Sequence, residues 1–129
     1  MSIVNVGIDS ADVARFVRLL AQDRERLFTL LFGKEERAVM PMLNSKREAH
    51  YLAGRWAAKE ATAKALGTGI GAITFADVGV FSYASGQPYI TLYNKAFVRS
   101  QSLNIDRWHI SITHVRDVAT AYVIAERCL

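Results

Sequence analysis

The sequence has few of the residues that cross-link or interrupt a chain. It contains one cysteine and two prolines among 129 residues, with no low-complexity tract, linker-like segment or internal repeat. A single thiol cannot form an internal disulfide, so nothing argues for an oxidising compartment. The length is typical of one domain and allows a sizeable core. We therefore expect residues 1–129 to form a single domain.

Long apolar runs are also missing. No stretch approaches the roughly 20 apolar residues that a membrane-spanning helix needs. The opening residues lack the basic segment, apolar run and cleavage site of a signal peptide, and they resemble a strand instead. We expect a cytoplasmic protein with no membrane partner.

Charge is only slightly unbalanced. Sixteen Lys plus Arg face twelve Asp plus Glu, for a net charge of +4. Such a balance favours an anionic partner, which could be nucleic acid, a phosphorylated cofactor or an acidic protein. A nucleic-acid-binding module would cluster its cations among exposed aromatic residues. The cations here are mostly scattered, so we expect no nucleic acid partner.

Helices are predicted to dominate the first half of the chain. A mostly apolar strand at residues 3–8 should be buried on both faces and end at Gly7-Ile8-Asp9. Helical spacing of apolar residues then predicts helices at 11–23, 24–31 and 33–39.

The clearest predicted element is a long helix over residues 45–66. Ser45 and Glu48 match a capping box at its start, and Gly67 offers a left-handed stop. One side of the helix carries small residues, which let another backbone approach closely. The helix is therefore expected to lie against a sheet or a second subunit.

Strands dominate the second half. Residues 78–83 and 88–92 flank a turn, and residues 94–103 form a short helix. Residues 107–113 and 118–125 form an antiparallel hairpin. Helices followed by strands indicate an α+β fold, with an antiparallel sheet packed on one long helix and shorter helices around it.

Asp9 is the first candidate for chemistry, because a carboxylate after an apolar strand is poorly placed for simple solvation. Mg²⁺ prefers one or two carboxylates, with phosphates and water completing its coordination. Asp9 could be one such ligand. The alternative is an N-cap for the helix that starts near Ala11.

The long helix supplies a second acid. Glu60 and Lys64 lie one turn apart on a face shared with Trp56, while Arg55 and Lys59 form a neighbouring stripe. One acid among three cations suits a metal–diphosphate site. The alternative is an exposed helix with an ordinary Glu–Lys pair.

Two further features are weaker signals. Gly67-Thr68-Gly69-Ile70-Gly71 contains the glycines of a nucleotide loop, but these glycines close a helix and a C-cap loop is favoured. His114 ends a predicted strand beside a turn, where it could reach a pocket, bind phosphate or act as a base. A solvated structural histidine is the alternative.

Together these segments resemble the holo-acyl-carrier-protein synthase family of phosphopantetheinyl transferases. The segment from Leu52 to Gly69 is similar to the family's signature helix. Gly7-Ile8-Asp9 matches its opening motif, and Gly86-Gln87-Pro88 matches its Gly-x-Pro turn. Ile110 to His114 is similar to its closing Ser-x-Ser-His strand, with Thr113 in place of the second serine.

The resemblance implies a family fold, an activity and a set of site residues. The activity would be Mg²⁺-dependent transfer of phosphopantetheine from coenzyme A to a serine of acyl carrier protein, a step of fatty acid biosynthesis. Asp9 and Glu60 would hold Mg²⁺, Lys64 would lie against the diphosphate, and Arg55 would hold the nucleotide or carrier side. Gly86, Pro88, Thr113 and His114 would line the coenzyme A pocket. A homotrimer with shared active sites is also implied.

Some points stay open at this level. The serine proton could pass to Glu60, His114 or a metal-bound water. Two departures from the family pattern are Asp12, where a glutamate is frequent, and Gly33, which lacks a capping hydroxyl. The rival to a transferase is a coenzyme A thioester hydrolase, which would not need Asp9 and Glu60 together.

Overall fold

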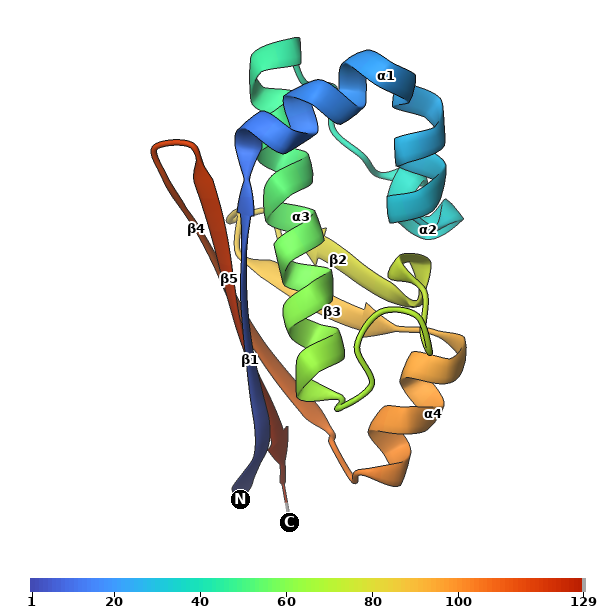
Figure 1. Cartoon of the computed structure of the whole chain (residues 1–129). Helices are drawn as coiled ribbons and strands as arrows, with labels where there is room; N and C mark the ends of the chain where they lie inside the picture. The colour runs from blue at the N-terminus through green and yellow to red at the C-terminus, as the bar shows by residue number, and fades with distance from the viewer. Residues whose placement is uncertain (129) are drawn as a thin grey trace.

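A computed structural model describes residues 1–128 as an α+β protein with two antiparallel sheets around one long helix (Figure 1). The fold class predicted from the sequence is confirmed. The elements in chain order are β1 (Ser2–Asp12), α1 (Val13–Leu31), α2 (Lys34–Ala38), α3 (Ser45–Ala65), a 3-10 helix (Phe75–Asp77), β2 (Val78–Ser82), β3 (Pro88–Leu92), α4 (Asn94–Ser102), β4 (Arg107–Val115) and β5 (Val118–Arg127).

The larger sheet has the strand order β1-β5-β4, so the two ends of the described chain pair with each other. The sequence predicts a first strand that is buried on both faces and ends at Asp9, and both parts of this prediction are wrong. β1 continues to Asp12, and Ile3 and Ile8 are 63% and 55% exposed. The reason is that α3 covers one face of the sheet while no described element covers the other (Figure 1).

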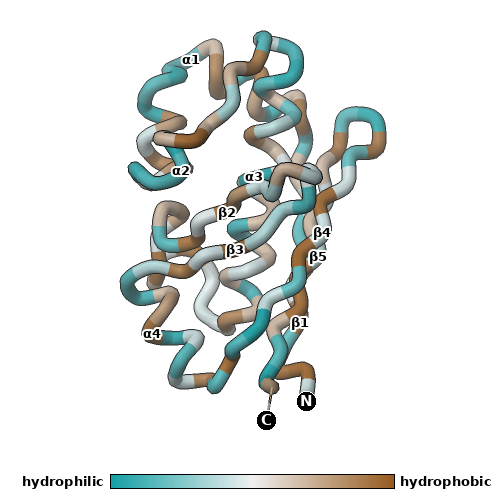
Figure 2. Tube along the Cα trace, turned by 180° about the vertical axis from the view of Figure 1, so that it is seen from behind, coloured by the Kyte–Doolittle hydropathy of each residue, from teal (hydrophilic) through white to brown (hydrophobic). Residues whose placement is uncertain are grey.

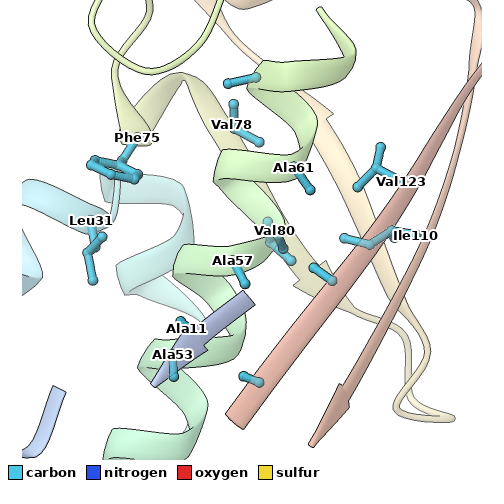
Figure 3. Packing of buried hydrophobic residues seen from close by; sticks show 14 of the residues in the cluster. Ala11, Leu31, Ala53, Ala57, Ala61, Phe75, Val78, Val80, Ile110 and Val123 are labelled. Carbon is cyan, nitrogen blue, oxygen red and sulfur yellow. The ribbon is translucent and has the colours of Figure 1, made fainter. Parts of the chain in front are cut away.

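Small residues let α3 lie directly on this sheet, as predicted. Ala53, Ala57 and Ala61 have no exposed surface and face the strands (Figure 3). The backbones approach closely at Gly7 of β1, where an added Cβ would lie 1.9 Å from the carbonyl oxygen of Ala61. Backbone therefore meets backbone here, and this contact sets the position of β1 against α3.

The start of α3 differs from the predicted capping box. Asn44 is the N-cap, and its Oδ1 accepts the N–H of Arg47 at 2.9 Å. Glu48 instead accepts two hydrogen bonds from the guanidinium of Arg24 in α1. The helix ends as predicted, because Gly67 adopts a positive φ of 76°.

The two helices predicted before and after Asp23 form one element with a kink. Asp23 has non-helical angles (φ −161°, ψ 91°), and its side chain accepts the N–H of Arg26 as an N-cap would. The first half starts at Val13, two residues later than predicted, because β1 continues to Asp12. Gly33 is the N-cap of α2 and has no capping hydroxyl, but Glu36 Oε1 accepts the Gly33 N–H, which is the half of a capping box that needs no hydroxyl.

The smaller sheet is the β2–β3 hairpin, which lies on the other side of α3 from β1 (Figure 1). Its turn docks on β4 through Gln87, whose Nε2 donates to the carbonyl of Ile110. Seen from behind, apolar residues are spaced along β1 and β5 (Figure 2). No helix in the described part of the chain is long and apolar enough to cross a membrane.

Candidate metal and phosphate site

Asp9 lies inside β1, on the face turned toward α3. Its Oδ1 accepts the N–H of Ser10 at 3.0 Å and lies 3.3 Å from Nζ of Lys64. Lys64 Nζ also donates to the carbonyl of Ile8 at 3.2 Å. Asp9 is not the N-cap of the following helix, because that position belongs to Asp12. Gly7 of the same strand faces α3, and side chains two residues apart share a face, so the Asp9 carboxylate also points toward the helix.

Glu60 lies one turn before Lys64 on α3 and shares this site with Asp9. Burial raises the pKa of the Glu60 carboxyl, and the negative charge of Asp9 raises this pKa further. The charges of Lys64 and Arg15 act in the opposite direction on the same pKa. A cation bound between the two carboxylates would offset the effect of Asp9 on Glu60.

The donor set fits Mg²⁺ better than a closed protein site. Among residues 1–128, no three His, Cys, Asp or Glu side chains gather as a metal cage. Mg²⁺ is commonly held by one or two carboxylates and completes its shell with water and substrate phosphates. Asp9 and Glu60 supply that number, and Lys64 supplies a positive charge beside them for a phosphate oxygen.

Lys59 does not belong to this cluster of cations. The sequence places it in a stripe with Arg55, yet its side chain has no exposed surface. Its ammonium donates to Glu36 Oε1 at 2.7 Å and to the carbonyls of Phe75 and Val78. Burial lowers the pKa of Lys59 to about 8, although the paired Glu36 opposes this shift. Lys59 thus holds α2 and β2 against α3.

Arg55 lies with the β2–β3 hairpin. Its NH2 donates to Ser82 Oγ at 2.9 Å, and its guanidinium stacks over Tyr51. Ser82 pairs with Pro88 across the hairpin, and Gly86 with φ of 92° forms the turn. A cavity of about 440 Å³ is lined by Tyr51, Arg55 and Ser82. Arg55 thus contacts the end of the hairpin that carries the 86–88 turn, on a different part of the surface from Asp9.

His114 lies on β4, beside the first half of α3. Its Nε2 is 3.0 Å from the carbonyl oxygen of His50, and it lies against Gly54. The two histidines line a cavity of about 430 Å³ together with Tyr51, which also borders the cavity of Arg55. The residues that complete this lining are Leu43, Lys46 and Arg47.

Thr113 points to the opposite face of the sheet from His114. It pairs with Thr120 of β5, whose Oγ1 is 2.9 Å from Ser10 Oγ of β1. Neighbouring side chains of a strand alternate between faces, so Thr113 and His114 cannot line one pocket within a single chain.

The predicted site residues thus form two groups. Asp9, Glu60 and Lys64 make the first, and Arg55, the 86–88 turn and His114 make the second. His50 and Lys64 are fourteen residues apart on α3, which is about 21 Å of helix axis.

Sequence reasoning missed three cations and one histidine beside these groups. Arg15 stacks over Trp56 with 5.0 Å to the ring centroid and acts on Glu60. Lys46, Arg47 and His50 line the cavity of His114. Two basic residues in the first turn of the long helix were the available signal, since this end already attracts anions.

Comparison with known proteins shows the family of this chain. The family model described as the 4'-phosphopantetheinyl transferase superfamily matches residues 5–123. The holo-[acyl-carrier-protein] synthase of Alkalilimnicola ehrlichii is 42% identical over 125 residues, which cover 96% of this chain and 97% of that protein. The corresponding synthase of a Geobacillus species is 37% identical over 126 residues, covering 97% and 98%.

Solved structures agree as well. The holo-[acyl-carrier-protein] synthase from Neisseria meningitidis is 33% identical, with a TM-score of 0.85 over 98% of this chain and 100% of that one. The synthase from Helicobacter pylori, solved in complex with coenzyme A, is 27% identical, with a TM-score of 0.78 over 94% and 99%. Sequence, fold and the resemblance of the motifs agree that this chain belongs to the 4'-phosphopantetheinyl transferase superfamily.

Proposed function

We propose that this protein transfers the 4'-phosphopantetheine group of coenzyme A to a serine of apo-acyl carrier protein. The products are the holo-carrier protein and adenosine 3',5'-bisphosphate, and the reaction serves fatty acid biosynthesis. The observation that carries the proposal is the meeting of Asp9, Glu60 and Lys64 between β1 and α3. A thioester hydrolase would have no use for this paired acid site.

Asp9 and Glu60 would hold Mg²⁺, which supplies positive charge to the coenzyme A diphosphate when it is bound. The chain's own contribution is Lys64, which is half-exposed and reaches the rim of the site. Its ammonium is placed to contact a phosphate oxygen as negative charge builds up during transfer. The serine oxygen forms the new bond to the phosphorus that bears pantetheine, and the bond to the bisphosphate oxygen breaks.

The serine proton needs an acceptor, and Glu60 is the side chain that we assign. It stands in the site beside Asp9 and Lys64, where the attacking serine would meet the phosphate. His114 lies away from Asp9 within one chain and already donates its Nε2 proton to a helix carbonyl. We therefore place His114 in coenzyme A binding.

The rest of coenzyme A would contact the second group of residues. The cavity beside His114 carries Lys46 and Arg47 and suits its 3'-phosphate. Arg55, Ser82 and Tyr89 border the adjoining cavity, and the 86–88 turn connects the two strands that carry Ser82 and Tyr89. Thr113, on the far face of the sheet, would join the pocket only at a contact between subunits.

A homotrimer with active sites shared between neighbouring subunits would explain why the site residues form two separate groups in one chain. The uncovered face of the β1-β5-β4 sheet exposes Val6, Ile8 and Tyr122 by 45%, 55% and 44%. Exposed apolar patches of this kind mark association surfaces. Packing another copy there would cover the apolar side chains and bring the two groups of site residues together from different chains.

The carrier protein would approach along α1. Arg15 borders the acid pair, and Arg18 follows it on the exposed side of the same helix. Carrier proteins are acidic, so these charges would speed the encounter.

The reaction proposed here belongs to the cytoplasm, and the whole chain would act as one catalytic domain.

The test is to incubate the protein with coenzyme A, Mg²⁺ and apo-acyl carrier protein, and to weigh the carrier by mass spectrometry. Phosphopantetheine should be added by the wild type and not by Asp9→Asn or Glu60→Gln. Asp12→Asn is the matched control, because Asp12 is exposed and makes no side-chain capping bond. Full transfer by both site variants would refute the assignment, and hydrolysis of acyl-coenzyme A without transfer would refute the function.

A further inference from the structure

Two histidines line the cavity at the start of α3, and only His114 has a role so far. His50 lies on α3 and His114 on β4, with their ring centroids 6.0 Å apart. The cavity also carries Lys46 and Arg47, and its remaining lining residues are Leu43 and Tyr51. Within residues 1–128, no carboxylate lines it, and Glu48 in the same turn is held by Arg24.

Each histidine has one ring nitrogen committed to the backbone. His50 Nδ1 lies 3.2 Å from the carbonyl oxygen of Lys46, and His114 Nε2 lies 3.0 Å from that of His50. A carbonyl oxygen only accepts, so both of these nitrogens carry the proton. The other nitrogens, His50 Nε2 and His114 Nδ1, have no hydrogen-bond partner within residues 1–128.

This tautomer has a consequence for anion binding. In the neutral form, the second nitrogen offers a lone pair, which repels a phosphate oxygen. After protonation, the same nitrogen becomes a charged donor. Because Lys46 and Arg47 are the other charged groups in the lining, no neighbouring acid holds the extra proton before the anion arrives.

We propose that His50 is a second phosphate-binding side chain of this cavity, and that it makes binding of the coenzyme A phosphate depend on uptake of a proton. The proposal rests on the function proposed above, because that function supplies the phosphate. Binding would be tighter toward pH 6 and weaker toward pH 8. Release of the bisphosphate product would be favoured at the higher pH.

The test is calorimetric titration of the wild type with adenosine 3',5'-bisphosphate between pH 6 and pH 8, in buffers of different ionisation enthalpy. Such titrations count the protons taken up on binding. His50→Gln is the test variant, and His109→Gln is the matched control because His109 lies on β4 beside Glu126. Protonation of the ligand itself is common to all three proteins and cancels in the comparison.

We expect wild type and His109→Gln to lose affinity by about fivefold more than His50→Gln as pH rises, since one charge-assisted hydrogen bond is lost. Proton uptake should fall in His50→Gln alone. His50→Lys, which keeps its charge, should restore tight binding at pH 8. Equal proton uptake in all variants would overturn the proposal. Carrier-protein transfer by the same wild-type preparation separates this result from failure of the proposed function.

Discussion

Gly7→Ala tests whether the backbone contact between β1 and α3 places the acid pair. Gly7 lies on the strand of Asp9, and its missing side chain faces the carbonyl of Ala61, the residue after Glu60. Adding one methyl group there changes no charge and no catalytic side chain. Any loss of activity must therefore come from a change in position.

The size of the displacement follows from the structure. The new Cβ would lie 1.9 Å from the Ala61 oxygen, whereas contacts under 3.0 Å are essentially never seen. β1 and α3 must therefore separate by roughly 1 Å or more, since the obstacle is backbone on both sides. Misplacement by about 1 Å can cost 100-fold in rate. Overpacking of this kind costs about 1–3 kcal/mol of stability, occasionally more.

Two measurements separate these effects. Urea unfolding gives the free energy of unfolding, and the carrier-protein transfer assay at saturating Mg²⁺ gives kcat/KM. Asn5→Ala is the control, since it adds no bulk at an exposed position of the same strand. We expect the folded fraction of Gly7→Ala to lose about 100-fold in kcat/KM. Wild-type stability and rate in this variant would refute the idea that the contact sets the site.

Three further predictions concern other contacts. Lys59→Met should cost about 3–5 kcal/mol by leaving Glu36 buried without its partner, and Lys59→Met with Glu36→Leu should recover much of this in urea unfolding. Because the pKa of Lys59 is about 8 when folded and about 10.5 when unfolded, the unfolded chain binds more protons in that window. The free energy of unfolding of the wild type relative to Lys59→Met should therefore rise from pH 8 to 10.5. In NMR titrations of the metal-free protein, Asp9→Asn should lower the pKa of Glu60 and Lys64→Ala should raise it; no change in either would contradict their proximity. Tyr122→Asp should give a smaller particle with little transfer activity in sedimentation and transfer assays, whereas Val98→Asp, an exposed site on α4, should change neither.

Local patterns predicted most of the elements, because caps, turns and periodicity act over a few residues. The 24–31 helix, the β2–β3 hairpin and the glycine stop at Gly67 needed no distant partner. The predicted capping box at the start of α3 was wrong because Glu48 accepts hydrogen bonds from Arg24, which comes from another helix. The predicted burial of the first strand was wrong because a strand with apolar residues on an uncovered face has the same sequence pattern as a buried strand.

The sequence by itself determined the helix face that Glu60 and Lys64 share, since helical spacing is a local property. Tertiary structure alone decided which cations lie beside Glu60. Lys59, adjacent to Glu60 in sequence, turns into the core to pair with Glu36, while Asp9 arrives from an edge strand. Only packing decides whether a lysine of α3 lies in the core or at the site, because that depends on which surface the helix buries.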